Sequence, residues 1–191
     1  MRPPLAEPEE PRKPYPRRMP SSQFDPSPFA SADHRNAMLE ALRGAFTLDW
    51  QGIHGVGHWS RVLTNGKRLA QLEAGIDVGV IELFAWLHDS CRLNDGTDPE
   101  HGPRAALLAH ELRGDYFELS DGRFERLVQA CEQHTRGGTE ASPTVMACWD
   151  ADRLDLGRVG ITPDPERLCT DAARSAEIIS WALRRSMESR P

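Results

Sequence analysis

The chain has 191 residues, which suits one domain of ordinary size with a single hydrophobic core. Its formal net charge is -6, and no dense basic stripe crosses the region expected to fold, so the composition argues against a dedicated surface for duplex nucleic acid. No apolar run reaches the roughly 18 residues that a membrane helix needs, and the first residues lack the apolar core of a signal peptide. We therefore expect a cytoplasmic protein without a membrane partner.

The first thirty residues differ in composition from the rest of the chain. Residues 1–30 contain nine of the fifteen prolines, mixed with charged residues and serines. Such a segment buries too little apolar surface to offset the entropy of ordering, so we expect a disordered tail followed by one domain over 31–191. The basic stretch PRKPYPRR within it is interpreted as a solvated extension, with contact to nucleic acid or an acidic partner as the alternative.

Helical periodicity dominates the region after the tail. Asp33 is expected to cap a first helix over 34–46, and a second helix should run from about Gly57 to near Gly75. The segment VGVIELFAWLHD, residues 78–89, is apolar on nearly every side. This pattern predicts a helix that is buried at the centre of the domain.

The second half of the chain continues the helical pattern. Pro103 fits the first turn of a fourth helix, where an N–H has no intrahelical partner in any case. Ser120 or Asp121 is expected to cap a fifth helix, Pro143 to open a sixth, and a last amphipathic helix to cover 171–187. No segment alternates with period two over a useful length. The sequence therefore predicts an all-α bundle of about six to seven helices without internal repeats.

A His-Asp doublet, His88 and Asp89, ends the most apolar segment of the chain. An unpaired carboxylate in such a place meets a large desolvation penalty. A divalent metal removes that penalty, because it compensates the carboxylate charge and accepts an imidazole nitrogen as a ligand. His58, in HGVGHWSRV, and Asp152, in CWDADRLDLG, supply the same two ligand types elsewhere in the chain.

The order of these groups resembles the HD-domain superfamily of metal-dependent phosphohydrolases. A His is followed by a His-Asp pair and then by an Asp inside A-D-R-L, over about residues 49–161. The resemblance implies an HD-domain helical bundle. It also implies that the metal ligands are His58, His88, Asp89 and Asp152.

Two further histidines match the extended ligand set of binuclear members, such as the HD-GYP phosphodiesterases and the RNase Y type. They are His101, in EHGPRAA, and His134, in ACEQHT. If these two bind a second ion, Asp89 is the natural bridging carboxylate. The GYP signature is absent, so the resemblance does not extend to the cyclic-dinucleotide subfamily. The cofactor is thus one or two divalent ions, and the ligands suit Mn, Fe, Co, Ni, Zn or Mg without choosing among them.

Several neighbouring side chains are candidates for supporting roles. Arg92 lies where many HD hydrolases carry a lysine and is expected to clamp a substrate phosphate. Arg61 is expected to pair with Asp152 or a nearby carboxylate, and Asp155 to orient a ligand histidine. His54 either assists the substrate or caps a helix. The candidate catalytic residues are Asp89, Arg92, His101 and His134.

The resemblance implies a metal-dependent phosphohydrolase in which metal-activated water attacks phosphorus. The expected partner is a small phosphorylated substrate, with nucleotides favoured by analogy with the small single-domain members of the family. One alternative is a mixed-valence di-iron oxygenase related to inositol oxygenase, which shares the H…HD…H…H…D order. Another is a non-catalytic metal- or ligand-binding HD domain. The A-D-R-L segment resembles the hydrolase branch most closely.

Overall fold

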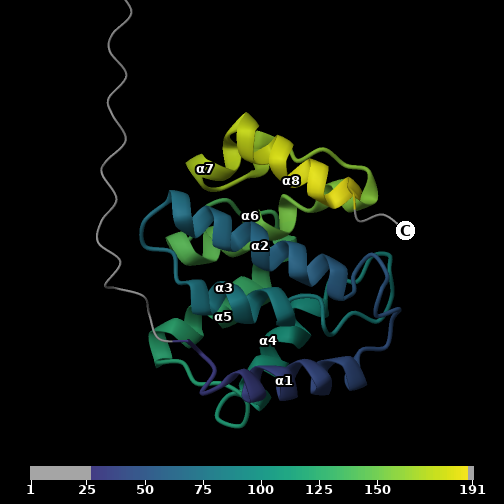
Figure 1. Ribbon diagram of the computed structural model, residues 1–191, viewed down its shortest axis with the longest axis vertical. Helices are drawn as coiled ribbons and strands as arrows, with labels where there is room; N and C mark the ends of the chain where they lie inside the picture. The colour runs from purple at the N-terminus through teal and green to yellow at the C-terminus, as the bar shows by residue number, and fades with distance from the viewer. Residues whose placement is uncertain (1–26, 189–191) are drawn as a thin grey trace, which may run out of the picture.

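The computed structural model describes residues 27–188 (Figure 1), and within them the chain is helical and contains no β-strand. Three short 3-10 helices, η1 (His134–Arg136), η2 (Leu156–Val159) and η3 (Pro165–Arg167), join the longer elements. The expected all-α class is confirmed. The α-helices are α1 (Ala32–Ala45), α2 (Val56–Leu72), α3 (Val78–Leu87), α4 (His101–Leu112), α5 (Asp121–Gln133), α6 (Pro143–Arg153), α7 (Asp171–Arg174) and α8 (Ala176–Glu188).

Helix α3 is the centre of the bundle, as its apolar sequence predicts. Every residue from Gly79 to Leu87 is buried, and α2, α4, α5 and α6 all pack against this helix. Figure 1 shows α3 between α1 on one side and α7 with α8 on the other. Asp77 caps the helix by accepting from the N–H groups of Gly79 and Val80, and it also pairs with Arg123 across 2.6 Å. The start of α3 is thus held both by the capping of its backbone N–H groups and by the ion pair between Asp77 and Arg123.

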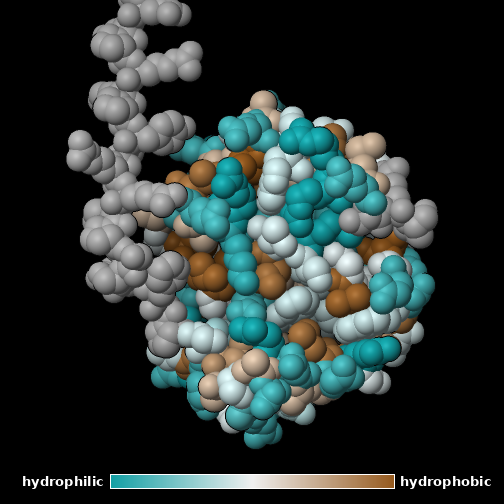
Figure 2. Space-filling view, in the orientation of Figure 1, coloured by the Kyte–Doolittle hydropathy of each residue, from teal (hydrophilic) through white to brown (hydrophobic). Residues whose placement is uncertain are grey.

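The surface in Figure 2 mixes hydrophilic and hydrophobic residues, and the hydrophobic ones lie in several separate patches on this face. Most large apolar side chains are inside: Trp59, Phe84 and Leu127 are fully buried. Scattered apolar residues on a surface are ordinary, so this face offers no broad apolar area. No helix within residues 27–188 is long and apolar enough to cross a membrane.

Helix α1 begins two residues before the position that the sequence suggests. Asp33 is not the cap: Ser31 occupies the N-cap position, and its Oγ accepts a hydrogen bond from the N–H of His34. Serine and aspartate both satisfy the free N–H groups at a helix start. The sequence offers either residue, and the extended backbone at Ser31 decides between them.

The expected last helix over 171–187 divides into α7 and α8 at Ser175. The backbone of Ser175 is extended, its Oγ donates to the carbonyl of Ala172, and the same oxygen accepts from the N–H of Ile178. A serine side chain competes with the helical ladder in this way. The break lets α8 pack along a different direction from α7 while the amphipathic pattern continues through both.

The four residues at the start of the described region belong to the folded domain. Phe29 is 5% exposed, and the carbonyl of Pro28 accepts a hydrogen bond from the N–H of Glu118 at 2.8 Å. The domain therefore includes residues 27–30, which the sequence analysis assigned to the tail. The remainder of the predicted tail, residues 1–26, lies outside the described residues.

Two deletions test where the tail ends and the domain begins. Removing residues 1–30 also removes Phe29, whose burial contributes about 1.5–3 kcal/mol. Because 1 kcal/mol shifts the melting temperature of a chain of this size by about 2–4 °C, we expect a fall of roughly 3–12 °C. Removing only residues 1–26 should leave the melting temperature unchanged, since their composition supplies little apolar surface. Thermal unfolding followed by circular dichroism measures both, and an equal fall for the two deletions would contradict the boundary.

Candidate metal centre

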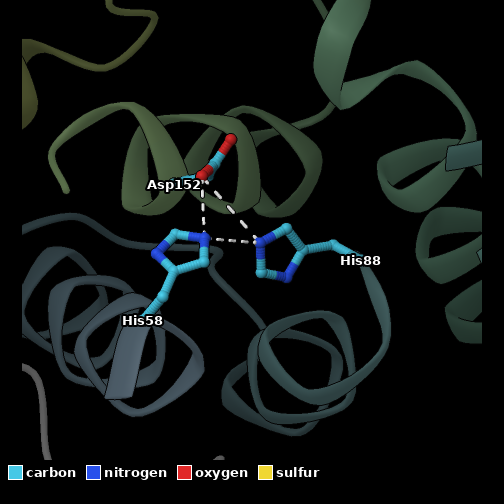
Figure 3. Close-up of side chains that lie close together, drawn as sticks. All are labelled: His58, His88 and Asp152. Atoms are coloured by element: carbon cyan, nitrogen blue, oxygen red, sulfur yellow. Dashed lines mark hydrogen bonds and ion pairs between the residues drawn. The ribbon is translucent and has the colours of Figure 1, made fainter. Parts of the chain in front are cut away.

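The six predicted ligands come together in the interior, although they lie on segments far apart in the chain. His58 lies in the first turn of α2, and Asp152 is near the end of α6. His88 and Asp89 directly follow α3, His101 begins α4, and His134 begins η1. Figure 3 shows the side chains of His58, His88 and Asp152 pointing toward one another from three segments.

The first group of ligand atoms surrounds the Nε2 atom of His58. This atom is 3.0 Å from Nε2 of His88 and 3.3 Å from Oδ1 of Asp152. Oδ2 of Asp89 lies 3.5 Å from it and 3.8 Å from Nε2 of His88. Four side chains therefore direct one ligand atom each toward a common point, which we call the first cluster.

The second group uses the other oxygen of Asp89. Its Oδ1 is 3.0 Å from Nε2 of His101 and 3.8 Å from Nε2 of His134, and the two Nε2 atoms are 2.8 Å apart. We call Asp89, His101 and His134 the second cluster. Asp89 therefore belongs to both clusters, one oxygen to each, which is the arrangement of a bridging carboxylate.

Each of the four clustered histidines is held through its Nδ1 atom. Nδ1 of His58 is 2.7 Å from a carboxylate oxygen of Asp155, and Nδ1 of His134 is 2.7 Å from the carbonyl of Cys131. Nδ1 of His88 donates to the backbone carbonyls of residues 84 and 85. Nδ1 of His101 donates to the backbone carbonyl of residue 98. These oxygens only accept hydrogen bonds, so Nδ1 carries the proton and Nε2 keeps its lone pair.

The resulting arrangement of lone pairs suits a cation. Neutral imidazoles that donate through Nδ1 cannot hydrogen-bond to each other through Nε2, yet the two Nε2 pairs are only 3.0 and 2.8 Å apart. A divalent ion would take both lone pairs of such a pair as ligands. The donor set and its spacing therefore fit a divalent ion in each cluster.

Burial keeps one imidazole neutral, whereas nearby carboxylates favour the charged form of another. Burial lowers the pKa of His88 to about 3, against the opposing influence of the nearby carboxylates of Asp89 and Asp152. Burial also opposes the charged form of His134, but Asp89 and Asp152 outweigh it and raise the pKa of this ring. Protons and a divalent ion thus compete for His134, and metal affinity is expected to fall as the pH is lowered.

Both carboxylates are held ionised by their neighbours. Burial alone would raise the pKa of Asp89, but the neighbouring imidazoles, first His88 and then His101, His134 and His54, keep it well below its usual range. The pKa of Asp152 is likewise held below its usual range, because the nearby imidazoles outweigh the effect of burial. Two anionic oxygen ligands are therefore present at neutral pH, as a cation site needs.

Two residues that the sequence left open also contact Asp89. His54 does not cap α2, because its Nδ1 lies 2.9 Å from Oδ2 of Asp89, and the N-cap residue is Gly55. Nε of Arg92 lies 2.9 Å from Oδ1 of the same carboxylate, and its Nη1 donates to loop carbonyls of residues 94 and 96. Nη2 of Arg92 has no hydrogen-bond partner among residues 27–188.

The expected supporting contacts of His58 are present, and Arg61 takes the second of its two expected partners, a carboxylate near Asp152. Asp155 accepts from Nδ1 of His58 and is 1% exposed. Arg61 pairs with Asp155 and not with Asp152: its Nε lies 2.7 Å from Oδ1, and its Nη2 lies 3.1 Å from Oδ2. Burial opposes ionisation of Asp155, but His58 and Arg61 hold the pKa of its carboxyl below the usual value. This chain of contacts fixes the orientation of the His58 ring.

One supporting residue was missed by the sequence analysis. The carbonyl of Asp98 holds Nδ1 of His101, while its carboxylate accepts from Arg104 and from the N–H of Leu93. Arg104 also donates to the carbonyl of Cys91, so the loop between α3 and α4 is tied to both clusters. The only sequence signal was an acidic residue three positions before a helix-starting histidine, which is too common to be informative.

Comparison with solved structures gives a match that covers most of the chain. It is the crystal structure of a predicted HD superfamily hydrolase from an uncultured Thermotogales bacterium, with a TM-score of 0.61 and 26% sequence identity. The alignment covers 81% of this chain and 88% of that one. No family model and no curated protein matches the sequence. The likeness confirms the resemblance to the HD superfamily, and together with the two clusters it indicates a metal-dependent hydrolase.

Proposed function

We propose that the protein is a metal-dependent phosphohydrolase that acts on small phosphorylated compounds, with nucleotides as the first class to screen. The observation that carries the proposal is the pair of ligand clusters that share Asp89, one carboxylate oxygen to each. The likeness to a predicted HD superfamily hydrolase supports the hydrolase class. The order of the ligands and the A-D-R-L segment support the phosphoester chemistry.

The six ligand side chains would hold two ions, one in each cluster. The first ion would be held by His58, His88, Asp152 and Oδ2 of Asp89, and the second by His101, His134 and Oδ1 of Asp89. When bound, such ions lower the pKa of a coordinated water and polarise a phosphoryl oxygen. The hydrogen bonds to the four Nδ1 atoms keep each ring in one orientation, so that little reorganisation accompanies the reaction.

Arg92 would contribute a positive charge beside this site. Its Nε is occupied by Asp89 and its Nη1 by the loop carbonyls, so the guanidinium is held in place while Nη2 is left for another acceptor. A guanidinium matches the oxygens of a phosphate in both charge and geometry. Arg92 thereby would bind a phosphoryl oxygen of the substrate and stabilise the charge that develops on it.

Phosphate release without oxygen is the experiment that tests this function. Protein purified without added metal is analysed for its elements, and then incubated with a panel of phosphorylated compounds and Mn, Mg or Zn under strictly anaerobic conditions. Hydrolysis needs only water, so inorganic phosphate should be released with a redox-inert ion. A reaction that requires iron and consumes oxygen, measured with an oxygen electrode, would instead assign the same six ligands to a di-iron oxygenase. Bound metal without any turnover would favour a non-catalytic domain.

A further inference from the structure

The metal centre is closed on most sides and opens beside Asp152. The side chains of His58 and His88 are fully buried, and those of Asp89, His101 and His134 are 1–3% exposed. The side chain of Asp152 is 20% exposed. A substrate therefore reaches the ligand atoms from the side of Asp152, and the residues around that carboxylate meet the substrate first.

Arg158 follows Asp152 by six residues, and its guanidinium is held by two backbone carbonyls. Its Nε donates to the carbonyl of Ile53 at 2.9 Å, and its Nη1 is 3.3 Å from the carbonyl of Asp155. Ile53 precedes His54, which contacts Asp89, and Asp155 supports the ring of His58. The guanidinium thus joins the segment before α2 to the segment after α6, and both segments carry residues of the metal centre.

The guanidinium of Arg158 can donate a further hydrogen bond. Within residues 27–188, Nη2 has no hydrogen-bond partner, and neither of the two contacts that hold the group is an ion pair, because both acceptors are neutral carbonyls. A fixed, half-buried cation without an anionic partner is suited to bind an anion.

We propose that Arg158 binds the phosphoryl group of the substrate at the open side of the metal centre, where it supplements Arg92. The inference rests on the proposed phosphohydrolase function and makes it more specific. Two guanidinium groups beside two divalent ions suit the tetrahedral dianion of a phosphomonoester or a terminal phosphate. Arg92 contacts the bridging Asp89, whereas Arg158 contacts the carbonyl of Asp155, so each arginine would serve a different part of the site.

Inorganic phosphate is the probe that tests this assignment. Isothermal titration calorimetry on the zinc-loaded full-length protein compares wild type with Arg158→Gln. A charge-assisted hydrogen bond is worth about 1.5–3 kcal/mol, so the dissociation constant for phosphate should rise roughly tenfold to hundredfold. Metal content, measured by elemental analysis, should not change, because Arg158 contacts no ligand side chain.

Arg153→Gln is the matched control. Arg153 also ties loop carbonyls together, those of Gly138 and Arg167, but its hydrogen bonds within the described chain involve none of the metal-centre residues. Its dissociation constant for phosphate should equal that of wild type. Equal phosphate affinity in wild type and Arg158→Gln would overturn the role of Arg158 alone. Absence of phosphate binding and of phosphate release in metal-loaded wild type would instead overturn the proposed function.

A second measurement on the wild-type protein covers the case in which Arg158→Gln fails to fold. Phenylglyoxal modifies free guanidinium groups, and mass spectrometry of the digested protein gives the rate at each arginine. Saturating phosphate should slow the modification of Arg158 at least several-fold and leave that of Arg153 unchanged. An unchanged rate at Arg158 in protein that binds phosphate by calorimetry would contradict the proposal.

Discussion

Replacement of Asp89 by alanine is expected to abolish metal binding and turnover while helical content is largely retained. Asp89 provides one oxygen to each cluster, so its loss removes a ligand from both sites at once. Mutation of a residue that merely supports a metal ligand typically lowers affinity about 10–100-fold, and the loss of a shared ligand should exceed about 100-fold. The bundle core lies on α3 and its neighbours, and none of these apolar contacts depends on the carboxylate.

Elemental analysis, phosphate release and circular dichroism measure the three parts of this expectation. Asp77→Ala is a useful comparison, because Asp77 is also buried and charged but pairs with Arg123 at the start of α3. Breaking such a buried pair costs about 3–5 kcal/mol, so that variant should lose thermal stability while the ligand clusters persist. Full metal content in Asp89→Ala would refute the assignment of Asp89 as the shared ligand.

The double substitution His101→Ala with His134→Ala is expected to change the metal stoichiometry from two ions to one. The first cluster keeps four of its ligand atoms, from His58, His88, Asp152 and Oδ2 of Asp89, whereas the second keeps only one oxygen. Turnover should fall severely, since two ions act together on the attacking and leaving oxygens in two-metal hydrolases. Calorimetric titration of the apoprotein with Mn gives the stoichiometry.

His34→Ala with His110→Ala is the matched control for this experiment. Both of these histidines are exposed, and neither contacts the clusters within residues 27–188. This variant should bind two ions and keep wild-type turnover. If wild type itself binds only one ion at saturating metal, the second cluster is not a metal site. His101 and His134 would then serve as donors to the substrate phosphate or as proton carriers.

The sequence by itself determined the helical architecture and the identity of the ligands that meet. An apolar run on all sides places α3 at the centre, because hydrophobic burial depends on a periodicity that the sequence displays directly. The His-Asp doublet at its end must then lie near the core, and the resemblance to the HD superfamily grouped His58, His101, His134 and Asp152 with it. The sequence signals for capping were less decisive, as Ser31 and Ser175 show, because several residues nearby have the same capacity.

The tertiary structure alone decided which atoms of the centre face one another. Arg61 lies 94 positions from Asp155 in the chain, and no local pattern distinguishes that carboxylate from Asp152 as its partner. The contact of His54 with Asp89, the division of the two Asp89 oxygens between clusters and the position of Arg158 depend in the same way on how distant helices pack. A hydrogen bond or ion pair is formed within about 3 Å, whereas helix periodicity specifies only a face of a helix. The packing of α2, α3 and α6 decides which atoms come within that distance.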